Sequence, residues 1–475
     1  MNFYLLRGRL FRGFWLFDCH LLLSLTQRRS PTFYLTGNKN VTNNTQSSSL
    51  SHVFTQMNVT LFDPSCKKSE GLPQSQRLGV DSVAQMDAAF LNKFPSQCTL
   101  SKSMKKMRFE IVAICGFVLG AWAIPLHADS DAIVSKPFGK TTAGEPITLY
   151  TLTNDKGMSV SLMDYGATVV NLLVSDRTGK LDDIALGFES AEPYFTKSPY
   201  FGATIGRYGN RIAKGTFQLN GEAYHIPTNN NGNSLHGGDI GFDKHMWKAE
   251  TIGTTPPAIR FTRTSPDGEE GYPGSLDVAV TFTLTDKNQL RISYKATTDK
   301  PTVLNLTNHT YFNLAGAGNG TVLGQVMTIH AKAITPVDSL LIPTGKIQEV
   351  EGTPWDFRKG KAIGTDIQAT GGNPIGYDHN FVLDKGATYA AQVYEPASGR
   401  LMTVTTDQPG LQFYSGNFLD GTLTGKGGKV YPQYSAFCLE SQHFPDSPNH
   451  ANFPSTVLKP GDVYKSTTTY SFENK

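Results

Sequence analysis

The stretch LDVAVTFTLTDKNQLRISYKATT, from Leu276 to Thr298, indicates how the chain folds. Side chains along a β-strand point alternately to its two faces, so a strand with one buried face alternates apolar and polar residues. Two alternating runs on either side of the polar residues DKNQ predict an antiparallel hairpin with one buried face. The apolar positions are Val278, Val280, Phe282, Leu284, Leu290, Ile292 and Tyr294.

The same alternation recurs in MSVSLMDYGATVVNLLV, residues 158–174, and in VYKSTTTYSF, residues 463–472. Gly, Asp and Asn separate such runs from residue 129 onward, and no helical pattern of comparable length competes with them. No Pro/Ser-rich or charged linker divides this part, which is too long for a simple sandwich of about 100 residues. We therefore expect an all-β chain with one large antiparallel β-sandwich over residues 129–475.

The charge of the chain limits the kinds of partner it can have. Only 17% of the 475 residues are charged, and the formal net charge is +3. Soluble domains typically have about 25% charged residues, and nucleic-acid-binding proteins concentrate positive charge on one face. The composition therefore argues against a nucleic-acid partner.

The segment MKKMRFEIVAICGFVLGAWAIPLHADSD, which begins at Met104, has the pattern of a secretory signal peptide. Basic residues precede an apolar run over 111–124, and Ala128 provides a small residue at a cleavage point. The run is shorter than the roughly 20 residues that a membrane-spanning helix needs. We expect residues 104–128 to be a signal peptide and the protein to be periplasmic or secreted, without stable membrane insertion.

Residues 1–103 do not fit this interpretation, because a signal peptide acts at the start of a chain. The stretch is first basic and apolar and then polar, and no periodic element emerges from it. We expect residues 1–103 to be an over-extended start, with translation beginning near Met104. The alternative is a disordered or membrane-targeting extension.

Cysteine usage fits an exported domain without disulfides. Of the five cysteines, only Cys438 lies beyond the predicted signal peptide, so it has no partner for an internal bridge. Its neighbours SAFCLES alternate like a strand. A buried, inert thiol is therefore expected here rather than a nucleophile.

Several motifs carry polar residues that a sandwich core does not need. His236 in NSLHGGDIGF precedes a glycine pair that could let the backbone approach a ligand, and Glu440 interrupts the apolar run AFCL. Each residue also has a purely structural interpretation: a core histidine, a surface arginine, an aspartate that closes a turn, or a buried Glu–Arg ion pair. The candidates are Asn210 and Arg211 in GNRIAKGTF, His236, His309 in NLTNHTYFNLAG, Asp378 in YDHNF, Gln412 in GLQFYSG, and Glu440 in FCLESQHFP.

Motifs for metals and dinucleotides are missing from the sequence. There is no His-Glu-x-x-His, no Cys/His ligand spacing and no calcium loop. The run GAGNG from Gly316 lacks the preceding strand and following helix of a dinucleotide loop. We expect no metal and no cofactor.

The candidate residues together suit a neutral sugar. Hydroxyl groups need paired hydrogen-bond donors and acceptors, and the apolar faces of a sugar ring pack on aromatic side chains. A carboxylate opposite an imidazole also supplies a base and an acid. Such a pair, without a cofactor, can shuttle protons on a hemiacetal.

In this order, the motifs above and IPTGKIQEVEGTPWDFR resemble the aldose 1-epimerase family, the galactose mutarotases, over most of residues 134–472. The resemblance implies an isomerase with a galactose mutarotase-like supersandwich and a sugar cleft on one sheet. It implies that Glu440 in CLES is the general base and His309 in TNHTYF the general acid. Ser441 stands where the family often has Thr. Asn210, Arg211, His236, Asp378 and Gln412 would line the sugar site.

The expected reaction is interconversion of the α and β anomers of free aldohexoses such as galactose or glucose, a step of hexose metabolism. The expected partner is the small-molecule aldose alone, bound by a monomer or a homodimer. One alternative is a glycoside hydrolase that uses Asp378 and Glu440, which would require a carboxylate separation of about 5–5.5 Å or 6.5–9.5 Å. Another is a non-catalytic carbohydrate-binding module. A phosphorylated sugar would require a cluster of Arg or Lys, whereas the motifs place only Arg211.

Overall fold

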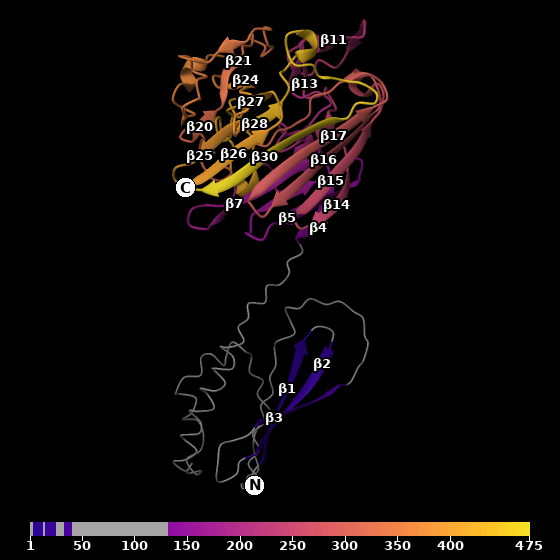
Figure 1. The fold of residues 1–475 in the computed structure, drawn as a ribbon, viewed down its shortest axis with the longest axis vertical. Coiled ribbons are helices and arrows are strands. Elements are labelled where there is room, and N and C mark those ends of the chain that lie inside the picture. The colour runs from indigo at the N-terminus through magenta and orange to yellow at the C-terminus, as the bar shows by residue number, and fades with distance from the viewer. Residues whose placement is uncertain (1–2, 13–14, 25–32, 40–131) are drawn as a thin grey trace. The chain divides into compact units, whose positions relative to one another are not determined.

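The computed structural model describes residues 3–12, 15–24, 33–39 and 132–475 (Figure 1). The chain divides into two units, Met1–Leu126 and His127–Lys475, and each is described by itself. The predicted signal peptide over 104–128 lies outside the described residues and stays a prediction. Among the described residues, no helix is long and apolar enough to cross a membrane.

In the first unit, the described residues form one antiparallel sheet in the order β1 (Phe3–Arg12), β2 (Trp15–Ser24) and β3 (Phe33–Lys39). The sequence gives no sign of these strands. Runs of consecutive apolar residues such as Leu21–Leu23 lack the two-residue period by which strands are recognised.

The second unit is built from antiparallel sheets, and its described residues include a single α-helix, α2 (Glu192–Thr196). The largest sheet has nine strands in the order β14 (Lys248–Thr254), β15 (Pro257–Ser265), β16 (Leu276–Thr285), β17 (Gln289–Thr298), β30 (Tyr464–Asn474), β26 (Arg400–Thr406), β25 (Ala391–Tyr394), β20 (Val326–Ile329) and β23 (Lys361–Ala362). A five-stranded sheet has the order β4 (Ile133–Lys140), β5 (Pro146–Thr153), β6 (Ser159–Met163), β7 (Thr168–Ser175) and β8 (Leu181–Asp183). A second five-stranded sheet has the order β22 (Gln348–Glu349), β21 (Ala331–Thr335), β24 (Asp378–Leu383), β27 (Gly410–Tyr414) and β28 (Cys438–Gln442).

Shorter elements connect these sheets. The two-stranded ladders are β10 (Arg211–Ile212) with β13 (Ser234–Leu235), β11 (Thr216–Leu219) with β12 (Glu222–His225), β18 (Thr302–Val303) with β29 (Val457–Leu458), and β19 (Thr307–Asn308) with β9 (Thr204–Ile205). Short 3-10 turns cover Ala213–Gly215, Phe242–Lys244, Glu269–Gly271, Ile367–Thr370, Lys426–Gly428 and Ser447–Asn449.

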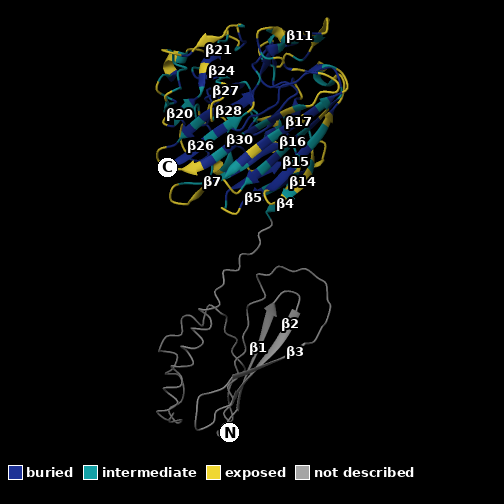
Figure 2. Cartoon of the chain, in the orientation of Figure 1, coloured by how far each residue is buried: buried dark blue, intermediate teal, exposed yellow. Residues whose placement is uncertain are grey.

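One hydrophobic core joins the three large sheets, which confirms the predicted all-β sandwich. Each sheet contributes buried apolar side chains to the same cluster, so the sheets pack as layers of one domain. Figure 2 shows the buried residues along the strands and the exposed ones mainly in the loops and at strand ends. Representative core residues are Leu162 and Val169, Val280 and Ile292, and Phe413 and Leu439.

The predicted hairpin over Leu276–Thr298 is confirmed as β16 and β17. Thr285 pairs with Gln289, and the ladder continues in register to Leu276 opposite Thr298. Asn288 closes the turn with a φ of 54°, in the left-handed region that Asn tolerates better than most residues. The alternating side chains named above are buried, as the pattern predicts.

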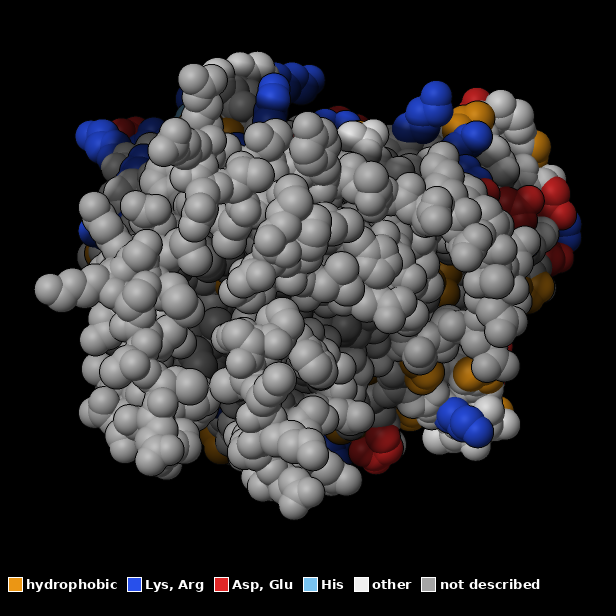
Figure 3. Space-filling view, turned by 90° about the horizontal axis from the view of Figure 1, so that it is seen from below, with side chains coloured by type: hydrophobic (Ala, Val, Ile, Leu, Met, Phe, Trp, Pro, Cys, Tyr) orange, Lys and Arg blue, Asp and Glu red, His pale blue; other side chains and the backbone are white. Residues whose placement is uncertain are grey.

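The charged side chains visible in Figure 3 include both signs: Lys and Arg occur at separate places along the margin, with Asp and Glu among them. The expectation, drawn from composition, that the partner is not a nucleic acid stays a prediction.

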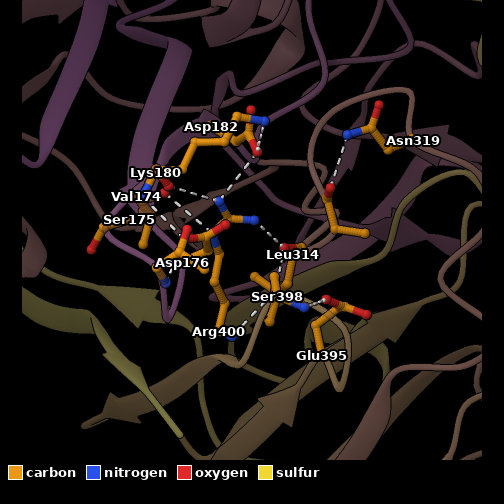
Figure 4. A network of polar contacts seen from close by, with 12 residues as sticks. Val174, Ser175, Asp176, Lys180, Asp182, Leu314, Asn319, Glu395, Ser398 and Arg400 are labelled. Carbon is orange, nitrogen blue, oxygen red and sulfur yellow. Dashed lines mark hydrogen bonds and ion pairs between the residues drawn. The ribbon is translucent and has the colours of Figure 1, made fainter.

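From a buried position, Arg400 on β26 links its own sheet to strands β7 and β8 and to the loop at Leu314 (Figure 4). Its guanidinium donates hydrogen bonds to the carbonyl oxygens of Val174, at 3.2 Å, and Leu314, at 2.9 Å, and it lies 3.4 Å from a carboxylate oxygen of Asp182. Leu314 follows the segment that carries His309, so this network holds that segment against the sheet formed by β4–β8. Charged donors to otherwise buried carbonyl groups are among the stronger hydrogen bonds in proteins.

We expect Arg400→Met to destabilise the protein by about 3 kcal/mol or more, because it leaves buried carbonyl groups and a partly buried carboxylate without their donor. Urea unfolding of the full chain measures this free energy. The matched control is Arg291→Met on the exposed side of β17, for which we expect a change within about 0.5 kcal/mol. Equal stability of the two variants would show that the Arg400 network does not stabilise the fold.

Candidate active site

Strands β24, β27 and β28 lie side by side in one sheet (Figure 1), and their paired residues present polar side chains on the same face. The ladder places Asn380 opposite Gln412 and Gln412 opposite Glu440. The alternate residues Leu411, Phe413 and Leu439 point into the hydrophobic core. Because the side-chain period of a strand is two, the core residues fix which side chains face the site.

The next row on that face is Asp378, Tyr414 and Cys438, again directly opposite one another in the ladder. The Gln412 Nε2 donates a 2.7 Å hydrogen bond to Asp378 Oδ1 across the two rows. The sequence allowed Asp378 to be a turn residue, whereas in the structure it is the first residue of β24 and is buried.

His309 reaches this face from a segment that is only partly a strand. Just Thr307–Asn308 form β19, and His309 follows with its N–H bonded to the Ala203 carbonyl at 2.9 Å. The side chain of Asn308 supplies a hydrogen bond where the strand ladder ends: its Nδ2 donates to the Gly202 carbonyl at 2.9 Å. The many Asn and Thr residues of NLTNHTYFNLAG thus hold an irregular backbone in a buried place.

Glu440 and His309 face each other in the interior. Glu440 Oε1 lies 3.7 Å from His309 Nε2, and the two residues are only 2% and 5% exposed. The buried Glu–Arg ion pair that the sequence left open is not observed: among the described residues, the charge-pair partner of Glu440 is His309. The second oxygen, Oε2, is buried without a protein hydrogen-bond partner.

His236 and Asn210 approach from the ladder of β10 and β13. The Asn210 backbone N–H donates to His236 Nδ1 at 3.1 Å, and both residues have left-handed φ angles, 61° for Asn210 and 52° for His236. Non-glycine residues in this region are strained and are often found at functional sites. The His236 and His309 ring centroids are 5.1 Å apart.

Gly237, the first residue of the glycine pair after His236, packs closely against another part of the backbone. Gly237 has a φ of 98°, and a Cβ built on it would lie 2.0 Å from the Gly206 carbonyl oxygen. This close approach is to the protein's own backbone, and an approach of the glycine pair to a ligand stays a prediction. The backbone contact seats the loop that carries His236.

Arg211 completes the group from the opposite side of Asp378. Its Nη1 lies 3.9 Å from Asp378 Oδ2, and its Nε donates to Asn230 Oδ1 at 3.2 Å. Arg211 is buried, so it is not the surface cation that the sequence allowed. The structure thus brings together all the predicted site residues, although their chemical roles stay predictions.

Burial raises the pKa values of the two acids of the site, Glu440 and Asp378. Desolvation raises the pKa of Glu440 well above its ordinary value, the Asp378 charge adds to the increase, and Arg211 opposes it. Desolvation also raises the pKa of Asp378, against the lowering effects of Arg211 and of the Gln412 hydrogen bond. The carboxyl group opposite His309 therefore favours its protonated form.

Burial lowers the pKa values of the two histidines of the site, His309 and His236. Desolvation lowers the pKa of His309 to about 4. The pKa of His236 falls well below its ordinary value, first through burial and then through the charges of His309, Arg211 and Lys244. With Glu440 protonated and His309 neutral, the pair carries one proton and no net charge.

A metal is a second chemical possibility for this group, because ligand atoms of His236, His309 and Glu440 lie within 4.8 Å of one another. The hydrogen bond from Asn210 decides against it. His236 Nδ1 accepts that hydrogen bond, so the proton of the neutral ring is on Nε2, where a metal would need a lone pair. The residues present do not fit a two-histidine metal site.

Sequence reasoning missed the aromatic side chains around His309. Tyr311 stacks on the imidazole with centroids 5.0 Å apart, and the rings of Tyr200 and Tyr414 lie at 5.9 and 6.4 Å. Tyr311 and Tyr414 lie inside the motifs quoted for His309 and Gln412. Their position in these motifs could have indicated that they lie near the site. Cys438 is buried and free, as predicted, but its sulfur lies 3.5 Å from His309 Nδ1.

The polar group is identified by its chemistry and not by the size of a cavity. A cavity of about 450 Å³ lies elsewhere, lined by His330, residues 382–390 and 405–409, Phe444 and Pro454. None of the predicted site residues lines it. The carboxylate, imidazole and amide groups converge instead on the face of β24, β27 and β28.

Comparisons with known proteins show the family of the chain. The sequence matches the family described as aldose 1-epimerase over residues 148–471. Galactose mutarotase of Rattus norvegicus is 48% identical over 333 residues, which are 70% of this chain and 95% of that protein. Aldose 1-epimerase of Escherichia coli strain K12 is 40% identical over 336 residues, 69% of this chain and 96% of that protein.

Solved structures of similar proteins have the same fold. A GalM/aldose epimerase homologue from C. elegans, 32% identical, superposes with a TM-score of 0.64 and covers 69% of this chain and 98% of its own. Galactose 1-epimerase from Lactobacillus acidophilus, 30% identical, has a TM-score of 0.63 and covers 72% and 98%.

Proposed function

The chain belongs to the aldose 1-epimerase family and is an isomerase, and we propose that Glu440 and His309 interconvert the α and β anomers of free aldohexoses such as galactose. The observation that carries this proposal is the 3.7 Å approach of Glu440 Oε1 to His309 Nε2 in a buried site. The mutarotase function of the family does not favour the hydrolase or the non-catalytic module.

The reaction begins when the proton that the pair shares moves from Glu440 to His309, which leaves a carboxylate facing an imidazolium. The carboxylate removes the proton from the anomeric hydroxyl, and the electron pair of that O–H bond forms the C1 carbonyl. The C1–O5 bond breaks, and O5 takes the proton from His309 Nε2. Rotation about C1–C2 exposes the other face of the aldehyde, and the reverse transfers close the ring to the opposite anomer.

The proton count of the pair is the same before and after ring opening. Before it, Glu440 is a carboxylate and His309 is an imidazolium; afterwards both are neutral. Burial favours the neutral form of each group, as the raised pKa of Glu440 and the lowered pKa of His309 indicate. Ring opening therefore removes two charges from a desolvated site.

The remaining polar residues orient the sugar. His236 has its proton on Nε2 and is a fixed hydrogen-bond donor. Gln412 Oε1 is buried without a protein partner and offers an acceptor for a sugar hydroxyl. Arg211 is engaged by Asp378 and Asn230, so its charge is compensated within the protein. This balance supports a neutral hexose rather than a phosphorylated one.

Removing either member of the pair should stop catalysis while the fold persists. We expect Glu440→Gln and His309→Asn to lower the mutarotation rate by at least about 10²-fold, because each removes one positioned proton-transfer group. Polarimetry of freshly dissolved α-D-galactose or α-D-glucose measures the rate, and Glu250→Gln on the exposed side of β14 is the control. An undiminished rate in folded Glu440→Gln would contradict the base role. An undiminished rate in His309→Asn would assign the acid to His236.

The pair also sets the pH dependence. Activity needs one proton on the pair, so it falls when a second proton binds at low pH and when the last proton leaves at high pH. We expect kcat/KM to decline as the pH drops through about 4, the lowered pKa of His309. The decline of kcat/KM at high pH should occur well above the ordinary pKa of glutamate, because burial raises the pKa of Glu440. An acid limb near pH 6.5, the ordinary histidine value, would contradict the desolvation of His309.

A further inference from the structure

Strand β28 presents two side chains to the same imidazole. Cys438 and Glu440 are two residues apart and therefore on the same face of the strand. Glu440 Oε1 lies 3.7 Å from His309 Nε2, and Cys438 Sγ lies 3.5 Å from His309 Nδ1. The two ring nitrogens of His309 thus contact two side chains of the same strand, β28: Nε2 is near Glu440 and Nδ1 is near Cys438.

The proposed acid role of His309, on which this inference rests, determines where the ring protons must be. The imidazolium gives its proton from Nε2 to the sugar and later recovers it there. Nδ1 must hold its own hydrogen throughout, because a ring without either hydrogen would be an anion. The Nδ1 hydrogen needs an acceptor in this buried place, and the side chain within reach of Nδ1 is Cys438.

We propose that Cys438 is a positioning residue of the reaction: its sulfur accepts the Nδ1–H of His309 and so assigns proton exchange to Nε2, the nitrogen that faces Glu440. It does this without a negative charge next to the ring. A carboxylate in the same position would fix the tautomer too, but it would stabilise the imidazolium and weaken it as an acid.

The chemistry of the thiol suits this role. Burial raises the pKa of the Cys438 thiol well above its ordinary value, and the charges of Glu440 and Asp378 add to the increase, so the sulfur stays uncharged. A thiol sulfur is a weak hydrogen-bond acceptor. It therefore orients the imidazole while leaving the pKa of His309 low, which makes the imidazolium a strong proton donor.

The other groups around the imidazole do not provide this acceptor. Tyr311 and Tyr414 present ring faces or edges, and their hydroxyl groups are engaged elsewhere, with the Pro199 carbonyl and the Phe418 N–H. Cys438 is thus more than a small packing residue of the hydrophobic cluster that also contains Phe201, Tyr311 and Tyr414. The titratable and charged groups near the ring are Glu440 and Cys438 from β28, Asp378 from β24, Tyr414 from β27, Arg211 from β10, and Tyr200, His236 and Tyr311 from the adjoining segments.

The test compares Cys438→Ala, which removes the acceptor, with Cys438→Ser, which supplies a stronger one, in the full chain. We expect Cys438→Ala to lower kcat about tenfold or more with little change in KM, because the ring loses its alignment with the sugar. Cys438→Ser should keep most of kcat, and its acid limb should move to higher pH, because a hydroxyl stabilises the Nδ1–H better. The control is Ser441→Ala, a buried change on the other face of the same strand, which should leave kcat and the acid limb unchanged.

Nitrogen-15 NMR of the His309 ring provides a readout that packing alone would not move. In the wild-type protein with a neutral ring, Nδ1 should carry the hydrogen and Nε2 should not. A wild-type Nδ1 without hydrogen overturns the proposal, as does a folded Cys438→Ala with wild-type kcat and acid limb. If Cys438→Ala does not fold, the wild-type spectrum and the Cys438→Ser profile decide. Failure of the proposed function is recognised separately, by an undiminished rate in His309→Asn.

Discussion

Glu440 is a carboxyl group with 2% of its surface exposed, and none of the ion pairs among the described residues joins it to Lys or Arg. An isolated charge in such a place is costly, so the group resists ionisation. The same lack of water lowers the basicity of His309. The chemistry of the site follows from this desolvation, because two groups that both prefer neutrality share a single proton across 3.7 Å.

The layered packing of the sandwich holds Glu440 and His309 in this arrangement. β24, β27 and β28 are anchored by Phe381, Leu411, Phe413 and Leu439 in the core, which leaves their other face for polar groups. His309, by contrast, lies on a backbone that regular ladders do not hold, and amide side chains such as Asn308 supply the missing hydrogen bonds. Rigid strands therefore carry the base, while an irregular but fully bonded segment carries the acid.

The sequence predicts those parts of the fold in which only one face of a strand is buried. The Leu276–Thr298 hairpin is such a case, and its alternation is visible directly. β27 and β28 are buried on both faces, so the residue pattern around Gln412 and Glu440 does not show which face of the strand each side chain occupies. Their pairing depends on register between segments far apart in the chain, which local patterns do not encode. The motifs could name the site residues, but only the ladder shows which ones face each other.

Desolvation also affects the ring-opening step inside the site. In water the cyclic form of the sugar predominates, and ring opening there removes no buried charges. In the reacting form of the cyclic complex, with the shared proton on His309, the sugar faces an ion pair in a buried environment, whereas the open-chain aldehyde faces neutral Glu440 and neutral His309. Interactions that are stronger in the transition state than in the bound cyclic state lower the barrier, whereas equal stabilisation of both would not, and the transition state of ring opening has already lost part of this charge separation. The uncharged sulfur at Cys438 preserves that difference, since an anionic partner at Nδ1 would stabilise the imidazolium and with it the cyclic complex.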